Sequence, residues 1–386
     1  MTTPSKHAVR VVDSTLREGE QTPCVYFSSH AKLAIADLLD QVGVDVIEAG
    51  HPRVSESIAS VIKTLARRGL RAKVGAHSRS NPGDVILALE SGAGFIGVFL
   101  CVSDQRLSGV HRMSLEESLE MVRAAVRTIR RERPDVEIRY TPEDAVRSPM
   151  ENVIAAAAAA VEAGADVISV ADTTGVMAPG TSRSMHDYVA RLRAALGELG
   201  LSPEIAVHCH NDRGLALANA LDAVRAGASI VDASVLGLGE RAGIVDLASL
   251  LTTLQEEGYG SYQLDRLPML YELVSRHAGV SIPVNHPMIG ANAFTHCAGV
   301  HTRAALDDPL HYQSLDPALF GRESEICLDH MAGSAALRYA LAQAGVGELE
   351  PEAFDFVLSE VKEIGRRGRR IELDELPYIV SCGVEV

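Results

Sequence analysis

The sequence of 386 residues contains no long hydrophobic run, no excess of basic residues and no closely spaced cysteine pair. No apolar stretch reaches the roughly 18–20 residues needed to span a bilayer, and the opening MTTPSKHAVRVV has no apolar signal-peptide core. A formal net charge of −15 argues against nucleic acid or an anionic membrane as a partner. We therefore expect a soluble, cytoplasmic protein that binds neither.

The cysteines are few and scattered, and no CxxC pair or zinc-ribbon spacing occurs among them. In a chain of this length they are typical of free thiols in a reducing compartment. The positions are Cys24, Cys101, Cys209, Cys297, Cys327 and Cys382.

A repeated pattern occupies the first two-thirds of the chain. Four segments end an amphipathic stretch with a glycine, at 43, 92, 164 or 227, and then continue as an apolar strand. Glycine just past a helix end supplies the left-handed cap, so these segments predict helix–strand junctions. With four further Val- and Ile-rich stretches there are eight candidate strands, which begin near residues 9, 44, 71, 94, 136, 166, 204 and 229.

Eight strands that alternate with helices over about 250 residues are typical of a parallel (β/α)8 TIM barrel. An open doubly wound sheet is the alternative, but no G-x-G-x-x-G turn follows the first strand. We predict a catalytic barrel over residues 1–258, a linker and lid subdomain over 259–320, and a helical C-terminal subdomain over 321–386.

Polar residues recur at or just after the ends of the predicted strands. In a barrel these positions all lie at the C-terminal mouth, where active sites are built. They are Arg17 with Glu18, Glu48, His77, Ser103, Arg139 with Glu143, Asp172 with Thr173, His208 with His210, and Glu240 with Arg241.

His208 and His210 stand two residues apart at the end of the apolar run in AVHCHNDRG. In a strand, residues i and i+2 point to the same face, so both imidazoles can reach one metal ion. Two buried structural histidines are the alternative. Glu18 follows the first strand, which is near the seventh in a closed barrel, and a His₂–carboxylate set is a common catalytic metal site. We therefore predict that Glu18, His208 and His210 hold a divalent metal: zinc, manganese, magnesium or cobalt.

Six motifs together resemble the homocitrate synthase and 2-isopropylmalate synthase family, over residues 9 to 320. They are DSTLREGEQ, IRYTPEDAVRS, VADTTG, HCHNDRGLALANALDAVRAGA, VLGLGERAGI and FTHCAGVHTRA. The family comprises metal-dependent TIM-barrel acyltransferases that condense acetyl-CoA with a 2-oxoacid. The resemblance implies this reaction here, followed by hydrolysis of the thioester and release of CoA.

The resemblance also implies roles for individual residues. Arg17 would neutralise the oxygen of the attacked carbonyl, and Gln21 and Thr173 would bind the 2-oxoacid. Proton transfer from the acetyl methyl group would involve Glu143, His301 and Tyr312. The C-terminal region would pack over the barrel of a partner subunit, so that His301 and Tyr312 act across a homodimer interface. Three glycines of the VLGLGERAGI segment would either bind part of CoA or only make a tight turn: Gly237, Gly239 and Gly243.

The acceptor predicted from these motifs is 2-oxoglutarate. Glu18 in LREGEQ stands where isopropylmalate synthases usually have Asp, and GERAGI is nearer the homocitrate synthase form. Arg139 stands where branched-chain enzymes tend to have Glu, and a guanidinium can bind a distal carboxylate in a bidentate manner. We expect His77, Ser103 and Arg139 to contact that distal end.

Other interpretations of the motifs stay open. Oxaloacetate, phosphonopyruvate and 2-oxoisovalerate are alternative acceptors for the same chemistry. A carbon–carbon lyase of the same superfamily and a non-catalytic metal-binding homologue are further alternatives. One segment departs from the family pattern: near residue 328 the chain reads LDHMAGSAAL, where relatives carry a basic element.

Overall fold

The computed structural model describes residues 8–297, 304 and 308–384. The chain forms two compact units, Met1–Ile282 and Pro283–Val386. The predicted division between residues 258 and 259 falls inside the first of these units. Among the described residues, no helix is long and apolar enough to cross a membrane.

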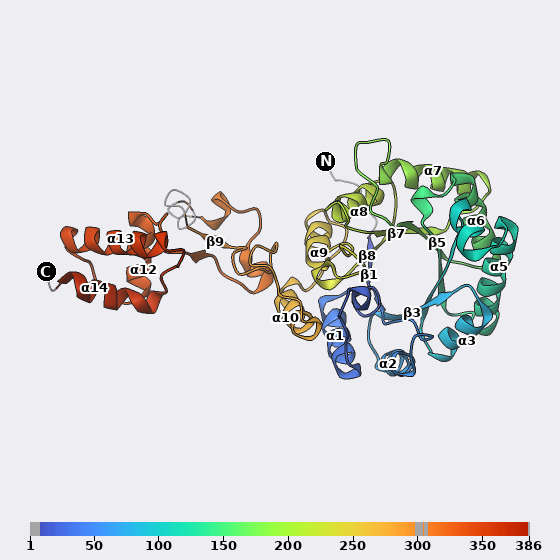
Figure 1. Cartoon of the computed structure of the whole chain (residues 1–386), viewed down its shortest axis with the longest axis horizontal. Coiled ribbons are helices and arrows are strands. Elements are labelled where there is room, and N and C mark those ends of the chain that lie inside the picture. Colours follow the sequence, from blue (N-terminus) through green and yellow to red (C-terminus); the bar gives the residue numbers. More distant parts are fainter. Residues whose placement is uncertain (1–7, 298–303, 305–307, 385–386) are drawn as a thin grey trace. The chain divides into compact units, whose positions relative to one another are not determined.

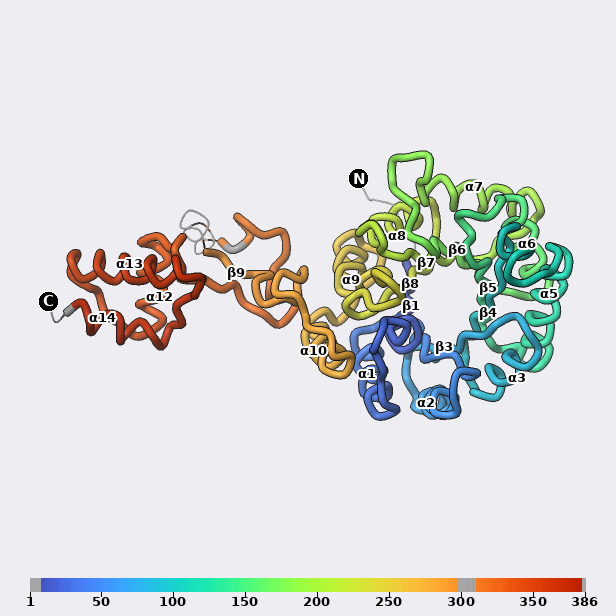
Figure 2. Tube along the Cα trace, viewed as in Figure 1, coloured from blue at the N-terminus to red at the C-terminus, as the bar shows by residue number. Residues whose placement is uncertain are grey.

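Eight parallel strands of the first unit close into a barrel in sequence order, as the sequence predicts (Figures 1 and 2). Arg10 of the first strand pairs with Ile230 of the eighth, which closes the ring. Every strand begins within two residues of its predicted start. The strands are β1 (Arg10–Asp13), β2 (Val46–Glu48), β3 (Lys73–Arg79), β4 (Phe95–Cys101), β5 (Glu137–Glu143), β6 (Val167–Asp172), β7 (Glu204–Cys209) and β8 (Ile230–Ala233).

Helices surround the ring of strands (Figure 1). The four glycines predicted to end helices all have positive φ, from 76° at Gly92 to 113° at Gly164. Ser28, Ser55 and Ser114 each accept a hydrogen bond from a backbone N–H of the first turn that follows. The helices are α1 (Ser29–Val42), α2 (Glu56–Ala66), α3 (Pro82–Glu90), α4 (Asp104–Arg106), α5 (Leu115–Glu132), α6 (Met150–Ala163), α7 (Met185–Glu198), α8 (Ala216–Arg225), α9 (Leu247–Glu256) and α10 (Leu267–Ala278).

The inside of the barrel is packed with apolar side chains, which include Val12, Val46, Phe95, Val167, Ala206 and Ile230. Beneath this layer, four alternate strands begin with a charged residue. Arg10 of β1 donates to Glu137 of β5 and to Glu204 of β7, and Lys73 of β3 also donates to Glu137. We call these four residues the basal ion-pair ring. It joins β1, β3, β5 and β7 at the end of the barrel opposite the predicted site.

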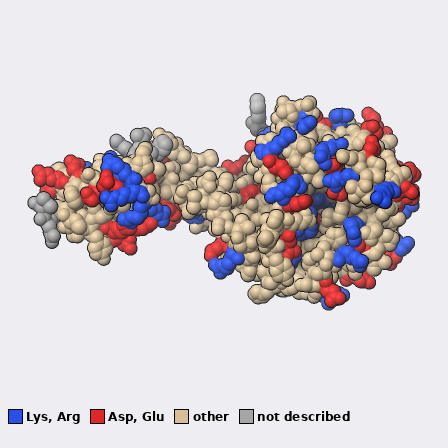
Figure 3. Space-filling model, in the orientation of Figure 1, with Lys and Arg blue, Asp and Glu red and all other residues tan. Residues whose placement is uncertain are grey.

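The second unit is mostly helical, as the sequence predicts (Figure 1). It contains α12 (Ser334–Gln343), α13 (Pro351–Arg366) and α14 (Leu376–Val384), together with a two-stranded parallel sheet of β9 (Thr295–His296) and β10 (Glu325–Ile326). Leu337, Val357 and Val361 are fully buried in its own hydrophobic core. On the face of the molecule shown in Figure 3, acidic and basic side chains are interspersed.

Candidate active site

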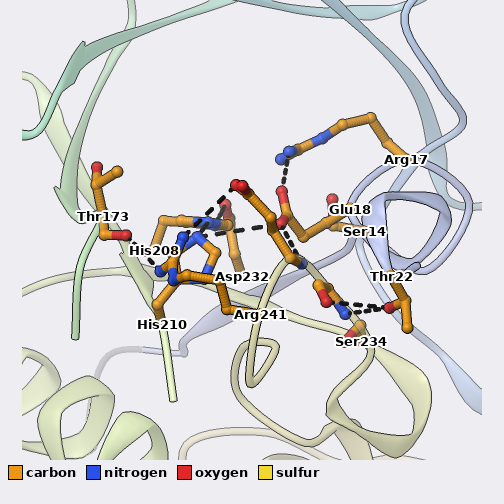
Figure 4. A network of polar contacts seen from close by, with 12 residues as sticks. Ser14, Arg17, Glu18, Thr22, Thr173, His208, His210, Asp232, Ser234 and Arg241 are labelled. Atoms are coloured by element: carbon orange, nitrogen blue, oxygen red, sulfur yellow. Dashed lines mark hydrogen bonds and ion pairs between the residues drawn. The ribbon is translucent and has the colours of Figure 1, made fainter. Parts of the chain in front are cut away.

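Glu18, His208 and His210 meet at the C-terminal mouth of the barrel (Figure 4). His208 lies on β7 and His210 directly after it, while Glu18 lies in a turn in which three successive N–H groups donate to the Ser14 carbonyl. The two Nε2 atoms are 3.3 Å apart, and His210 Nε2 is 4.0 Å from Glu18 Oε1. All three side chains are buried, and one ligand atom from each lies within 4.8 Å of the other two.

The protonation of this group suits a divalent cation. Burial, and next the neighbouring His208, lower the pKa of His210 to about 4, so its imidazole is neutral at pH 7. Burial alone would raise the pKa of Glu18, but Arg17 and the two histidines hold it below its ordinary value. His208 Nδ1 is 3.0 Å from the buried Asp232 carboxylate, which leaves Nε2 free to ligate. A carboxylate and two imidazoles whose ring nitrogens converge fit a divalent metal.

Arg17 lies between two carboxylates at the same mouth. Its Nε donates to Glu48 Oε2 at 2.7 Å, and its Nη1 donates to Glu18. Ser14 Oγ donates to Glu48 at 2.6 Å. Burial opposes ionisation of Glu48, but Arg17 and the other cationic groups hold its pKa far below the ordinary range. The guanidinium is therefore fixed in place by charged, desolvated partners.

A cavity of about 180 Å3 opens at this mouth. His77 lines it and stacks on Phe99, with ring centroids 4.7 Å apart. Burial, and next the positive charge of Arg17, lower the pKa of His77 to about 3, so it is neutral at pH 7. A second cavity of about 420 Å3 shares Arg17, Gln21 and His51 with the first. The residues that line the first cavity are Arg17, Glu18, Gln21, His51, His77, Phe99, Arg139, Thr141, Glu143, Ala171, Thr173, His208, His210 and Glu240.

The residues predicted to contact the distal end of the acceptor are placed differently from one another. His77 and Arg139 line the first cavity. Arg139 is buried, and its Nη1 and Nη2 donate to Asp232 Oδ1 and Oδ2 at 2.7 and 2.5 Å. The Ser103 hydroxyl lies 3.2 Å from Cys101 Sγ, and among the described residues it is not part of the cavity lining.

Of the residues predicted to transfer protons, Glu143 lines the cavity and accepts a hydrogen bond from Arg106. The neighbouring Arg147 pairs with Asp144, not with Glu143. Tyr312 belongs to the second unit, where its side chain is about half exposed, at 47%. His301 lies outside the described residues.

The three glycines of the VLGLGERAGI segment form a tight turn. The Ile244 N–H donates to the Gly237 carbonyl at 3.0 Å, and a Cβ on Gly243 would lie 1.8 Å from the Gly237 oxygen. A Cβ on Gly239 would meet Glu18 Cγ at 3.1 Å. The turn thus places backbone directly against a predicted metal ligand, and its part in CoA binding stays a prediction.

Several polar residues of the site were not assigned a role from the sequence. They are Glu48, Arg106, Thr141 and Asp232. Asp232 could have been noticed in the sequence, because it is the one charged residue in the apolar strand segment SIVDASV. A buried carboxylate in such a strand requires a cationic or hydrogen-bonding partner.

A family model described as HMGL-like matches residues 8–274. The chain belongs to this family. A second model, described as homocitrate synthase post-HMGL domain-like, matches residues 288–369 of this HMGL-like enzyme. The motif resemblance is thereby confirmed, and with it the prediction of a homocitrate synthase-like acyltransferase.

Curated relatives cover most of this HMGL-like chain. The homocitrate synthase of Pyrococcus horikoshii is 42% identical over 341 residues, which are 88% of this chain and 91% of that protein. A probable 2-isopropylmalate synthase of Ignicoccus hospitalis is 36% identical over 385 residues, 98% of this chain and 92% of that one. The structure of an HMG-CoA lyase from Bacillus subtilis has the same fold, with a TM-score of 0.61, 23% identity, and coverage of 73% of this chain and 97% of that chain.

Proposed function

We propose that this enzyme condenses acetyl-CoA with 2-oxoglutarate to form homocitrate and free CoA. The observation that carries the proposal is the convergence of Glu18, His208 and His210 beside Arg17 at the barrel mouth. The names of the relatives support the acceptor, since several of the most similar are homocitrate synthases.

The arginines and the predicted metal suit an anionic acceptor. Arg17 and Arg139 face Glu18, Glu48 and Asp232, and two further carboxylates line the same cavity, Glu143 and Glu240. A bound divalent ion would add two positive charges to this group. A divalent metal held by Glu18, His208 and His210 supplies a Lewis acid for the ketone and carboxylate oxygens of a 2-oxoacid. Zinc, manganese, magnesium and cobalt all suit these ligands.

The chain's own residues would share the remaining work. The Arg17 guanidinium, held by Glu48, would stabilise negative charge that develops on the ketone oxygen. Gln21, His77 and Thr173 would orient the acceptor in the first cavity. The charge of Arg139 is already paired with Asp232. Contact with a distal carboxylate would therefore require sharing or exchange of that partner.

The second cavity suits the acyl-CoA arm. It adjoins the first at Arg17 and Gln21, and Val25, Phe27 and Ile58 give it apolar walls against which a pantetheine chain can pack. We assign proton removal from the acetyl methyl group to Glu143 with His301 and Tyr312, and we expect a homodimer in which the last two residues serve the partner's barrel. Hydrolysis of the thioester then makes the reaction irreversible.

The experiment that tests the function is thiol release from acetyl-CoA, with purified enzyme, added divalent metal and a panel of 2-oxoacids. We expect the highest kcat/KM with 2-oxoglutarate. Preference for oxaloacetate, phosphonopyruvate or 2-oxoisovalerate would replace the acceptor and keep the chemistry. The relative named as a probable 2-isopropylmalate synthase makes 2-oxoisovalerate the most informative competitor.

Two controls accompany the panel. Glu18→Gln should abolish turnover and leave the folded state intact, because it removes the charged ligand and keeps the side-chain shape. Activity equal to that of the parent would refute the metal assignment. Incubation with 3-hydroxy-3-methylglutaryl-CoA separates the lyase alternative, and rapid cleavage of that thioester would favour it.

A further inference from the structure

Asp232 joins the predicted metal centre to Arg139. It lies on β8 inside the barrel and is fully buried. Its Oδ1 and Oδ2 accept the two Nη groups of Arg139, and Oδ2 also lies 3.0 Å from His208 Nδ1. One carboxylate therefore contacts a predicted metal ligand and the residue predicted to select the acceptor.

The bond to Asp232 determines which nitrogen of His208 carries the proton. A carboxylate oxygen accepts hydrogen bonds, so His208 Nδ1 is the donor to Asp232, and Nε2 is the ring nitrogen that faces His210. Arg139 holds both oxygens of the same carboxylate through two hydrogen bonds, which fixes the orientation of the acceptor.

The two histidines differ in this respect. Among the described residues, His210 Nδ1 is buried and has no hydrogen-bond partner. The orientation and tautomer of His208 are therefore fixed by the protein, whereas those of His210 are not fixed through Nδ1.

We propose that Asp232 is a positioning residue, which orients His208 for metal binding through a hydrogen bond that Arg139 sustains. The proposal rests on the metal assignment made above but not on the identity of the acceptor. Loss of such an outer hydrogen bond typically costs about 10–100-fold in metal affinity.

The test compares variants in which no buried arginine is left without its counter-ion. Arg139→Met removes the guanidinium and leaves both Asp232 and His208 in place, and it should bind Zn²⁺ more weakly than the parent if Arg139 sustains the bond. The double variants R139M/D232N and R139M/D232L keep or remove the acceptor atom. The dissociation constant of Zn²⁺ is measured by competition with a fluorescent chelator, without any substrate. Glu137→Gln is the matched control, because it breaks a bidentate carboxylate–arginine pair at the opposite end of the same barrel.

We expect R139M/D232L to bind Zn²⁺ about 10–100-fold more weakly than R139M, and R139M/D232N to recover most of that loss. Glu137→Gln should bind as the parent does. If the Leu and Asn variants are equally weak, Asp232 acts only through its charge, and the proposal fails. Binding by the Leu variant as tight as that of R139M would also refute it.

A measurement on the unaltered protein guards against variants that do not fold. Nitrogen-15 NMR of labelled histidines, with His208 assigned by His208→Gln, reports the tautomer in the metal-free enzyme. We expect His208 as the Nδ1–H form; the Nε2–H form would overturn the proposal. A parent that binds no Zn²⁺ would remove both the metal assignment and this inference, whereas another preferred acceptor in the panel would affect only the proposed function.

Discussion

At the scale of single residues, the barrel mouth holds several charged side chains away from water. Arg17, Glu18, Glu48, Arg139 and Asp232 are all buried or nearly so. Removing one partner from such a group leaves an uncompensated charge, which costs far more than a solvent-exposed pair would. The effect of a substitution here must therefore be judged from the ratio of kcat/KM between two substrates as well as from the absolute rates.

Arg139→Met tests whether Arg139 selects the acceptor. Loss of a charged hydrogen-bond donor should lower kcat/KM with 2-oxoglutarate by about 1.5–3 kcal/mol in transition-state stabilisation. A selector changes the ratio of kcat/KM for 2-oxoglutarate over 2-oxoisovalerate, whereas a purely structural residue lowers both alike. An unchanged ratio would assign Arg139 to the support of Asp232 alone.

His77 should make the stability of the enzyme depend on pH. Its pKa is lowered from 6.5 to about 3 in the folded chain. As the pH falls below 6.5, His77 becomes protonated in the unfolded chain but stays neutral in the native chain. The free energy of unfolding therefore decreases towards pH 3. His77→Asn lacks this titration. Urea unfolding between pH 6.5 and 4 should give a flatter profile for the variant, and parallel profiles would contradict the assignment.

At the scale of the elements, glycine at the helix ends decides where strands begin. Gly43, with φ of 102°, ends α1 and donates its N–H to the Leu39 carbonyl. Gly164 ends α6 in the same way, and Gly92 and Gly227, which also have positive φ, follow one residue after the caps of α3 and α8. The strands that follow can therefore start at fixed distances from the helices, and they enter the barrel in register.

A pair of glycine substitutions should have opposite effects on stability. Gly43→Ala forces a Cβ into the left-handed region and should destabilise the chain by about 1–2 kcal/mol. Gly197 lies within α7, has no positive φ, and has open space around its Cβ position. Gly197→Ala should stabilise by about 0.5–1 kcal/mol. Chemical denaturation measures both, and equal signs would refute this account of the junctions.

These local rules explain why the architecture could be predicted from the sequence. The glycine caps and the Val- and Ile-rich runs are short-range signals, and so is the spacing of His208 and His210. The partners of Asp232 could not be predicted in this way, because Arg139 lies 93 residues before it and His208 lies 24 residues before it. The contact of Arg106 with Glu143 likewise depends on how β4 and β5 lie beside each other.

At the scale of the whole molecule, the two ends of the barrel carry different groups of charged residues. The C-terminal mouth carries the candidate site, and the opposite end carries the basal ion-pair ring. Glu137 accepts from both Arg10 and Lys73, and these cations hold its pKa below the ordinary value although burial opposes this. The ring therefore ties alternate strands together without contacting the site.

Glu137→Gln should weaken the barrel and leave catalysis unaltered. We expect a loss of about 1–2 kcal/mol in the free energy of unfolding, since the pairs are partly exposed. The difference from the parent should shrink at high salt. It should also disappear as the pH falls through the lowered pKa of Glu137, because the parent's carboxylate is then protonated. A difference that is independent of salt and pH would point to packing instead of charge.

The closure of the ring has a consequence for folding during synthesis. β1 pairs with β8, and Arg10 and Ile230 are about 220 residues apart in the chain. At a synthesis rate of about 5–20 residues per second, the ribosome needs on the order of 10–45 s to make the strand that completes β1. Throughout that time the first strand has an open edge that can pair with the wrong neighbour. We therefore expect chaperones to bind the nascent chain until its eighth strand emerges from the ribosome.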